Sequence, residues 1–156
     1  MYKLDEIINT VINDDCMNVM KDLPDKSIDL CLCDPPYGIG IDDWDKNKTV
    51  VDYIKWLRPF TEEMERILRP NGSLYVFGNF KFIANIKVLL SDLDLELLSW
   101  IVWDKGSKEQ NSTRTYADIT EHCLLFIKGL KKDINIPTEL NTIRDISDIY
   151  LQISNS

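Results

Sequence analysis

The chain has 156 residues, of which 44% are hydrophobic and 28% charged, the size and composition of one globular domain. This composition excludes an intrinsically disordered chain, because enough apolar surface can be buried to offset the ordering entropy. The longest nearly uninterrupted apolar run, residues 97–103, is far shorter than the ~20 residues that cross a bilayer, and residues 1–10 lack a secretory signal pattern. We therefore expect a cytoplasmic protein with no membrane partner.

The net charge of −8 is unevenly distributed along the chain. Residues 1–46 carry 4 basic and 11 acidic side chains, whereas residues 47–156 carry 14 and 15. A basic surface would indicate nucleic-acid binding directly. Its absence predicts weak, salt-sensitive binding to DNA by this chain alone. The four cysteines lack metal-type spacing, so we interpret them as buried thiols and expect no metal site.

The spacing of apolar residues predicts alternating strands and helices. In chain order these are a strand over 7–12, a helix beginning at Asp14 or Asp15, a strand over 28–33, a helix over 50–68 that Pro59 kinks or divides, a strand over 73–77, a helix over 80–90, and strands over 97–103 and 121–127. Residues 70–72 predict a turn, 104–118 a polar loop, and 139–150 at most a short helix. This order predicts an α/β fold with a largely parallel sheet covered by helices.

The tetrapeptide Asp34-Pro35-Pro36-Tyr37 directly follows the predicted strand over 28–33. Two prolines end a strand, and ligands of an open α/β sheet bind beyond the carboxyl ends of its strands. Asp34 offers a carboxylate acceptor, Pro35 a carbonyl of fixed direction, and Tyr37 a flat ring with a polar tip. Two acceptors beside an aromatic ring fit an exocyclic amino group on a planar heterocycle. The alternative is an ordinary turn that ends the strand.

An exocyclic amine is a poor nucleophile because its lone pair is delocalised into the ring. Hydrogen bonds from its two protons to Asp34 and to the Pro35 carbonyl would favour a pyramidal nitrogen, whose lone pair points at an incoming electrophile. Stacking on Tyr37 would hold a base that is flipped out of a duplex. The motif therefore indicates chemistry on the amino group of a nucleobase.

Residues 12–39 strongly resemble the start of the DNA amino-methyltransferases, the adenine-N6 and cytosine-N4 family, in the permuted order that places the catalytic motif first. Further similar blocks are 69–77, 103–105, 116–119, 121–122 and 126–129. The resemblance implies a Rossmann-like methyltransferase sheet and transfer of a methyl group from S-adenosyl-L-methionine to a base amino nitrogen in duplex DNA. Aspartate rather than serine at the first motif position favours adenine over cytosine.

The resemblance also implies roles for individual residues near the reaction. The catalytic loop would consist of Asp34, Pro35, Pro36 and Tyr37. The cofactor contacts would be Asp15, which follows an earlier strand in the family, and Asp34. A simpler interpretation of Asp15 is a helix cap.

We expect four further residues to contact the substrate, namely Gly38, Trp44, Arg114 and Tyr116. Each has an alternative that the sequence leaves open. Gly38 is equally explained as a loop glycine and Trp44 as a packing residue. Arg114 and Tyr116 belong to a polar loop that either faces phosphates or is simply solvated.

The cofactor loop of the family, Phe-x-Gly-x-Gly, does not occur in the chain. The only glycines spaced by one residue are Gly38 and Gly40, in the catalytic loop, and Gly78 after Phe77 has no second glycine. The resemblance therefore implies an incomplete sheet, made only of the strands outside the cofactor-binding half. Two strands would be missing between the first predicted strand and the one that ends at Asp34.

The predicted domain organisation follows from this gap. We expect residues 1–130 to form the catalytic part of a methyltransferase domain and residues 131–156 a poorly defined tail. Unpaired backbone inside a sheet recruits a partner edge. The open alternatives are a truncated product, a catalytic half completed by a second polypeptide or a homo-oligomer, and an interaction subunit without independent catalysis.

Overall fold

The computed structural model describes residues 2–38, 49–106 and 119–129. In chain order its elements are α1 (Leu4–Ile7), α2 (Cys16–Asp22), β1 (Ile28–Cys33), α3 (Val50–Ile67), β2 (Leu68–Gly78), α4 (Ile83–Ser91), β3 (Leu95–Asp104) and β4 (Thr120–Lys128). The predicted α/β class is confirmed. Within these residues, no helix combines the length and the hydropathy needed to span a bilayer.

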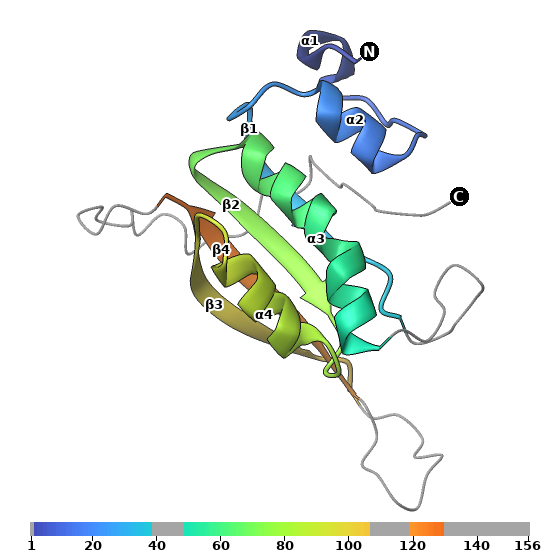
Figure 1. The fold of residues 1–156 in the computed structure, drawn as a ribbon, viewed down its shortest axis with the longest axis vertical. Helices are drawn as coiled ribbons and strands as arrows, with labels where there is room; N and C mark the ends of the chain where they lie inside the picture. Colours follow the sequence, from blue (N-terminus) through green and yellow to red (C-terminus); the bar gives the residue numbers. More distant parts are fainter. Residues whose placement is uncertain (1, 39–48, 107–118, 130–156) are drawn as a thin grey trace, which may run out of the picture.

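The four strands form one sheet in the order β1-β2-β4-β3 (Figure 1). β1 and β2 are parallel, whereas β4 is antiparallel to both of its neighbours, β2 and β3. The prediction of a largely parallel sheet is therefore wrong, since two of the three strand pairs are antiparallel. β3 and β4 are consecutive strands among the described elements, and they pair antiparallel from Leu95 with Lys128 to Asp104 with Thr120. β4 then lies between β2 and β3.

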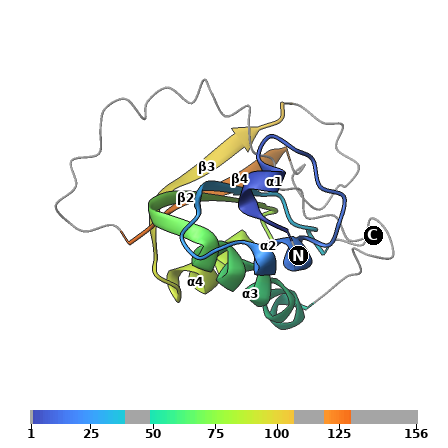
Figure 2. The same cartoon turned by 90° about the horizontal axis from the view of Figure 1, so that it is seen from above.

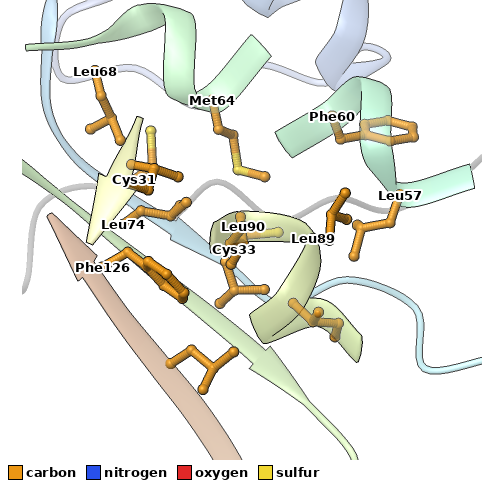
Figure 3. Close-up of a cluster of buried hydrophobic side chains, with 14 of the residues drawn as sticks. Cys31, Cys33, Leu57, Phe60, Met64, Leu68, Leu74, Leu89, Leu90 and Phe126 are labelled. Carbon is orange, nitrogen blue, oxygen red and sulfur yellow. The ribbon is translucent and has the colours of Figure 1, made fainter. Parts of the chain in front are cut away.

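The helices α3 and α4 cover one face of the sheet (Figure 2). Alternate residues in the second halves of β1 and β2 point into this layer and are buried, as the period of two in a strand requires. Figure 3 shows how these side chains meet those of the helices, and its labelled residues are Cys31, Cys33, Leu57, Phe60, Met64, Leu68, Leu74, Leu89, Leu90 and Phe126. Three cysteine thiols are buried as predicted, and Cys16 is half-buried. This layer is the hydrophobic core.

The predicted strand over 7–12 is not formed. Residues Leu4–Ile7 make the single turn of α1, and Thr10 closes it, with its backbone N–H and its hydroxyl both donating to the Ile7 carbonyl. Asn9 has a positive φ of 57°, which a strand does not allow. Val11 is fully exposed. Among the described residues no strand lies on the outer side of β1, so this segment has nothing to pair with and the expected gap inside the sheet does not arise.

Helix α3 continues through Pro59, so of the two predicted alternatives the division into two helices is wrong, and the kink stays a prediction. Proline removes one backbone hydrogen bond from the helix interior. Leu57, Phe60 and Met64 on either side of it are almost fully buried in the core. Their burial offsets the lost bond, so that the helix continues to Ile67.

The predicted turn over 70–72 is a bulge inside β2 rather than a turn before it. The register of the parallel pair slips here, because Ile28 is paired with Leu68 and Leu30 with Ser73. Asn71 supplies the positive φ of 66° that the extra residues need. A bulge keeps both ends of the segment in the same strand, and this explains why a turn signal occurs inside β2.

Arg66, near the end of α3, binds the chain segment that connects α2 to β1. Its guanidinium donates to the carbonyls of Met20 (2.7 Å) and Leu23 (3.0 Å) and pairs with Asp25 (2.5 Å) and Glu63 (2.8 Å). The carbonyls are those of the last turn and the cap of α2, where a cation is favourable. Arg66 therefore fixes the segment that leads into β1.

Replacing Arg66 by methionine is expected to lower the free energy of unfolding by about 2 kcal/mol, because two carbonyls lose charged donors. Solvent reaches about a third of the side chain (29% exposed) and screens the ion pairs. The measurement is urea denaturation followed by circular dichroism. Arg58→Met is the matched control, since Arg58 makes longer, more exposed ion pairs on the same helix. Equal losses in both variants would contradict the role assigned to Arg66.

Candidate active site

The tetrapeptide that begins at Asp34 lies at the carboxyl end of β1, as predicted. Cys33, the last residue of β1, is paired with Val76 of β2, so the loop leaves the sheet beside the carboxyl end of β2. Pro35 and Pro36 are buried, Tyr37 is half-buried and Asp34 is exposed. The rigid part of the loop is thus packed against the protein, while its carboxylate is open to a ligand.

Gly38 packs the loop against a pair of aromatic rings. It has a φ of +67°, and a Cβ atom placed on it would lie 3.2 Å from Tyr53 and 3.4 Å from Phe82. The rings of Tyr53 and Phe82 are stacked with their centroids 4.4 Å apart. Both the backbone conformation and the close packing therefore require glycine here. These contacts support the interpretation of Gly38 as a loop glycine, and its contact with substrate stays a prediction.

Asn79 is a residue of this site that the sequence analysis missed. It directly follows β2 and is buried, and its amide Nδ2 donates to the backbone carbonyl of Tyr37 at 3.4 Å. Its Oδ1 accepts from the backbone N–H groups of Lys81 (3.0 Å) and Phe82 (3.3 Å), which lead into α4. Asn79 thus joins the loop to the start of α4. The signal in the sequence was a polar residue at the end of a buried strand.

The carboxylates of Asp34 and Glu121 influence the pKa of Tyr37. Desolvation raises the pKa of the Asp34 carboxyl, the negative charge of Glu121 adds to this rise, and the Tyr37 hydroxyl opposes it by donating to Asp34. Desolvation, followed by the interactions with Asp34 and Glu121, also raises the pKa of Tyr37 far above its usual value. Tyr37 is therefore a neutral hydrogen-bond donor at all physiological pH values.

Glu121 forms an ion pair with Lys105 that the sequence analysis did not single out. Its Oε1 lies 2.6 Å from Nζ of Lys105, and both side chains are about four-fifths buried, with 20% and 19% exposed. Glu121 is in β4 and Lys105 directly follows β3, the two strands that pair in this part of the sheet. A buried carboxylate needs such a cation nearby.

The remaining predicted contacts are placed differently or lie outside the described residues. Asp15 caps α2, where its Oδ1 accepts from the N–H of Met17 at 2.7 Å, so its alternative interpretation is observed. Its contact with cofactor stays a prediction. Trp44, Arg114 and Tyr116 lie outside the described residues. Within the described ranges, no group of three or more histidine, cysteine or acidic side chains is arranged to hold a metal ion.

Comparison with known proteins tests the family resemblance directly. The sequence model of the DNA methylase family matches residues 28–153, which is most of the chain. The chain belongs to the DNA methylase family. Within this family it is similar to Type II methyltransferase M.HinfI of Haemophilus influenzae, with 30% identity over 146 residues, and to M.HpaI of Haemophilus parainfluenzae, with 32% over 148.

The alignments with these two DNA methylases cover only part of the relatives' own length. The alignments cover 83% and 93% of this chain but only 41% of M.HinfI and 46% of M.HpaI. The chain therefore spans less than half the length of either relative.

Solved structures show the same fold. PvuII DNA methyltransferase, described as cytosine-N4-specific, superposes with a TM-score of 0.64 at 22% identity, over 96% of this chain and 58% of that one. The M1.HpyAVI-SAM complex superposes with a TM-score of 0.55 at 22% identity, over 74% and 53%. The expectation of a Rossmann-like methyltransferase sheet in incomplete form is confirmed.

Proposed function

We propose that this chain is the catalytic part of an S-adenosyl-L-methionine-dependent DNA methyltransferase that methylates the N6 amino group of adenine after flipping the base out of the duplex. The observation that carries the proposal is the loop at the end of β1, with the Asp34 carboxylate exposed above two buried prolines. Family membership supports it. The type II methyltransferases among the relatives further suggest a place in restriction-modification.

The chemistry of the loop follows from its acceptors. When bound, the cofactor would supply a methyl group on a positively charged sulfur. The carboxylate of Asp34 would suit that positive charge, whereas Glu121 is already paired with Lys105. Asp34 and the Pro35 carbonyl would accept the two protons of the amino group and direct its lone pair outward. Transfer would balance if the N–C bond formed as the methyl group left the sulfur and one proton were released to solvent, while Asp34 and the Pro35 carbonyl would hold the amino group.

The preference for adenine over cytosine rests on aspartate at position 34 of the chain. In the resemblance described above, this residue type at the first motif position favours the adenine-N6 enzymes. PvuII DNA methyltransferase shares the fold but is cytosine-N4-specific, so the fold does not determine the base. The choice of base is therefore part of the proposal.

An alternative is that the chain lacks independent catalysis and is one subunit of a split enzyme, or a remnant. One observation favours it: β1 is an edge strand among the described residues although it bears the candidate loop. A second polypeptide or another copy of the chain would then cover that edge.

The test is transfer of a labelled methyl group from S-adenosyl-L-methionine into unmethylated duplex DNA. The chain is assayed alone and together with the part of M.HpaI that the alignment leaves out. Incorporation by the chain alone supports an independent enzyme. Incorporation only in the mixture supports the split enzyme. Absence of incorporation in both would contradict the proposed function.

The raised pKa of Asp34 predicts the pH dependence of this reaction. A protonated carboxyl loses acceptor capacity, so kcat/KM falls as the pH falls through the Asp34 pKa. Because desolvation raises that pKa above its ordinary value of 3.8, the acid limb lies above that of an unperturbed aspartate. Glu121→Gln removes a charge that contributes to the rise and should move the limb to lower pH. A limb that stays in place in this variant would contradict the assignment to Asp34.

A further inference from the structure

An exposed pair of residues, Phe80 and Lys81, lies beside the candidate loop, residues 34–37. Both follow Asn79, whose amide Nδ2 donates to the Tyr37 carbonyl at 3.4 Å, so the pair begins one residue from a direct contact with the loop. The side chain of Phe80 is 56% exposed. Lys81 is exposed as well and forms no ion pair within the described ranges. We call Phe80 and Lys81 the 80–81 tip.

The turn that carries the 80–81 tip is held on both sides. Before the tip, Asn79 is buried, and its Oδ1 accepts the backbone N–H of Lys81 at 3.0 Å. After the tip, Phe82 is buried and stacks on Tyr53, with ring centroids 4.4 Å apart. The backbone N–H of Phe82 donates to the Asn79 carbonyl at 3.2 Å and closes the turn. An aromatic ring that a fixed backbone holds in solvent is arranged for contact with a ligand.

Further apolar side chains are exposed at the same end of the sheet. One row of pairs joins Gly78 of β2 to His122 of β4, and His122 to Val102 of β3. Val102 is 57% exposed, and Trp100 is 42% exposed and donates through Nε1 to Nδ1 of His122 at 3.2 Å. Phe80 comes two residues after Gly78. Exposed apolar side chains that gather in one region mark a binding surface, and this one continues the edge that bears the candidate loop.

The chemistry of this edge favours DNA over a protein partner. The proposed function places the target base at the candidate loop, so the duplex around that base must lie over the neighbouring strand ends. Lys81 offers a cation for a backbone phosphate, and Phe80 offers a ring of the kind that packs against unstacked bases. The acidic residues at this end are placed differently, since Glu121 is paired with Lys105 and Asp104 lies on β3, the strand farthest from the loop.

We propose that the 80–81 tip contacts the DNA duplex beside the flipped base, with Lys81 on a phosphate and Phe80 against the bases that flipping leaves unstacked. The inference rests on the proposed function for the nature of the substrate. It adds two substrate-contact residues that neither the catalytic motif nor the blocks of the family resemblance include. No bond forms or breaks at the tip, which contributes only to binding and base flipping.

Binding of the chain alone to two fluorescein-labelled duplexes tests the proposal without catalysis. One duplex is fully paired, and the other carries a central A·A mismatch, which lowers the cost of moving a base out of the stack. Fluorescence anisotropy gives the affinity at several salt concentrations. Lys81→Gln should reduce the slope of log affinity against log salt by about one for both duplexes, because one phosphate contact is lost. Phe80→Ala should weaken binding to the mismatched duplex about fivefold, affect the paired duplex less and leave the slope unchanged.

Two residues further along α4 provide matched controls. Lys87→Gln removes a cation, and Val88→Ala shortens an apolar side chain that is 58% exposed. Both variants should bind like the unmodified chain. Equal affinities of Phe80→Ala and Val88→Ala for the mismatched duplex, or equal salt slopes of Lys81→Gln and Lys87→Gln, would overturn the proposal. Absence of binding to both duplexes at low salt would overturn it as well. If the tip variants weaken only association with the part of M.HpaI that the alignment leaves out, the tip is a protein interface and the proposal is wrong.

Methyl transfer separates a failure of this inference from a failure of the proposed function. In the preparation that transfers methyl groups, Phe80→Ala should lower kcat/KM more on duplex DNA than on the separated single strand, where no base pair has to open. Equal losses on both substrates would overturn the role of Phe80. If no preparation transfers methyl groups, the proposed function fails, whereas the anisotropy measurement still decides whether the 80–81 tip contacts DNA.

Discussion

Replacing Asp34 by alanine is expected to reduce methyl transfer to DNA about a thousandfold, the upper range for removal of one group that stabilises a transition state. The reason is the position of the exposed Asp34 at the end of β1, where we propose that its carboxylate is the charged acceptor for the amino group. Asp34→Asn keeps one acceptor oxygen and the shape of the side chain, so a smaller loss is expected. The measurement is the initial rate of label incorporation at saturating cofactor.

Asp29→Ala is the matched control for this prediction. Asp29 also belongs to β1, but its side chain is 75% exposed and forms a surface ion pair with Arg69. Its removal should leave the rate within about twofold of the unmodified chain, since surface pairs contribute little. Similar losses for Asp29→Ala and Asp34→Ala would contradict a specific role for Asp34.

Loss of activity in Asp34→Ala should not result from unfolding. Because the pKa of Asp34 is raised in the folded chain, the ionised carboxylate is less favourable there than in the unfolded chain. Its contribution to stability is therefore negative above the folded pKa and disappears as the pH falls below the unfolded one. At neutral pH the Tm of Asp34→Ala should equal or exceed that of the unmodified chain. A clear decrease in Tm would show that Asp34 holds the fold.

The largest loss of stability is expected for Phe126→Ala. Phe126 in β4 is fully buried and is paired with Leu74 of β2 (Figure 3). On its other side it is paired with Leu97 of β3. Truncation of a buried phenylalanine leaves a cavity and costs about 3–5 kcal/mol. This is a large share of the roughly 5–15 kcal/mol that stabilises a domain. The free energy of unfolding is measured in urea.

Val102→Ala on the neighbouring strand β3 is the control, since Val102 is 57% exposed. It should cost less than about 1 kcal/mol, because a surface substitution leaves no cavity. If Phe126→Ala were no more destabilising than Val102→Ala, the layer between the sheet and the helices α3 and α4 would not be the main core of the chain.

Local sequence patterns predicted those elements whose apolar residues face a single layer. The strand over 28–33 and the helix spanning Leu57 and Met64 follow from periodicity, since burial selects both. The strand over 7–12 could not be excluded in this way, because its residues fit a strand but have no neighbour to pair with. The position of β4 between β2 and β3 likewise depends on pairing of distant segments, which local patterns do not contain.

The candidate site divides in a similar manner. Asp34 and Tyr37 were found because they form a dense local motif at a strand end. Asn79 contacts the Tyr37 carbonyl and Glu121 pairs with Lys105, and only the fold brings these distant residues together. Gly38 is required by Tyr53 and Phe82, which no local pattern connects to it.

The most direct test of the central claim is analysis of the methylated base. Unmethylated duplex DNA is incubated with S-adenosyl-L-methionine and the chain, with and without the part of M.HpaI that the alignment leaves out, and then digested to nucleosides for mass spectrometry. The account predicts N6-methyladenine that depends on Asp34. N4-methylcytosine would contradict the assignment of adenine, and product that is equal with Asp34→Ala would contradict the catalytic role of the loop.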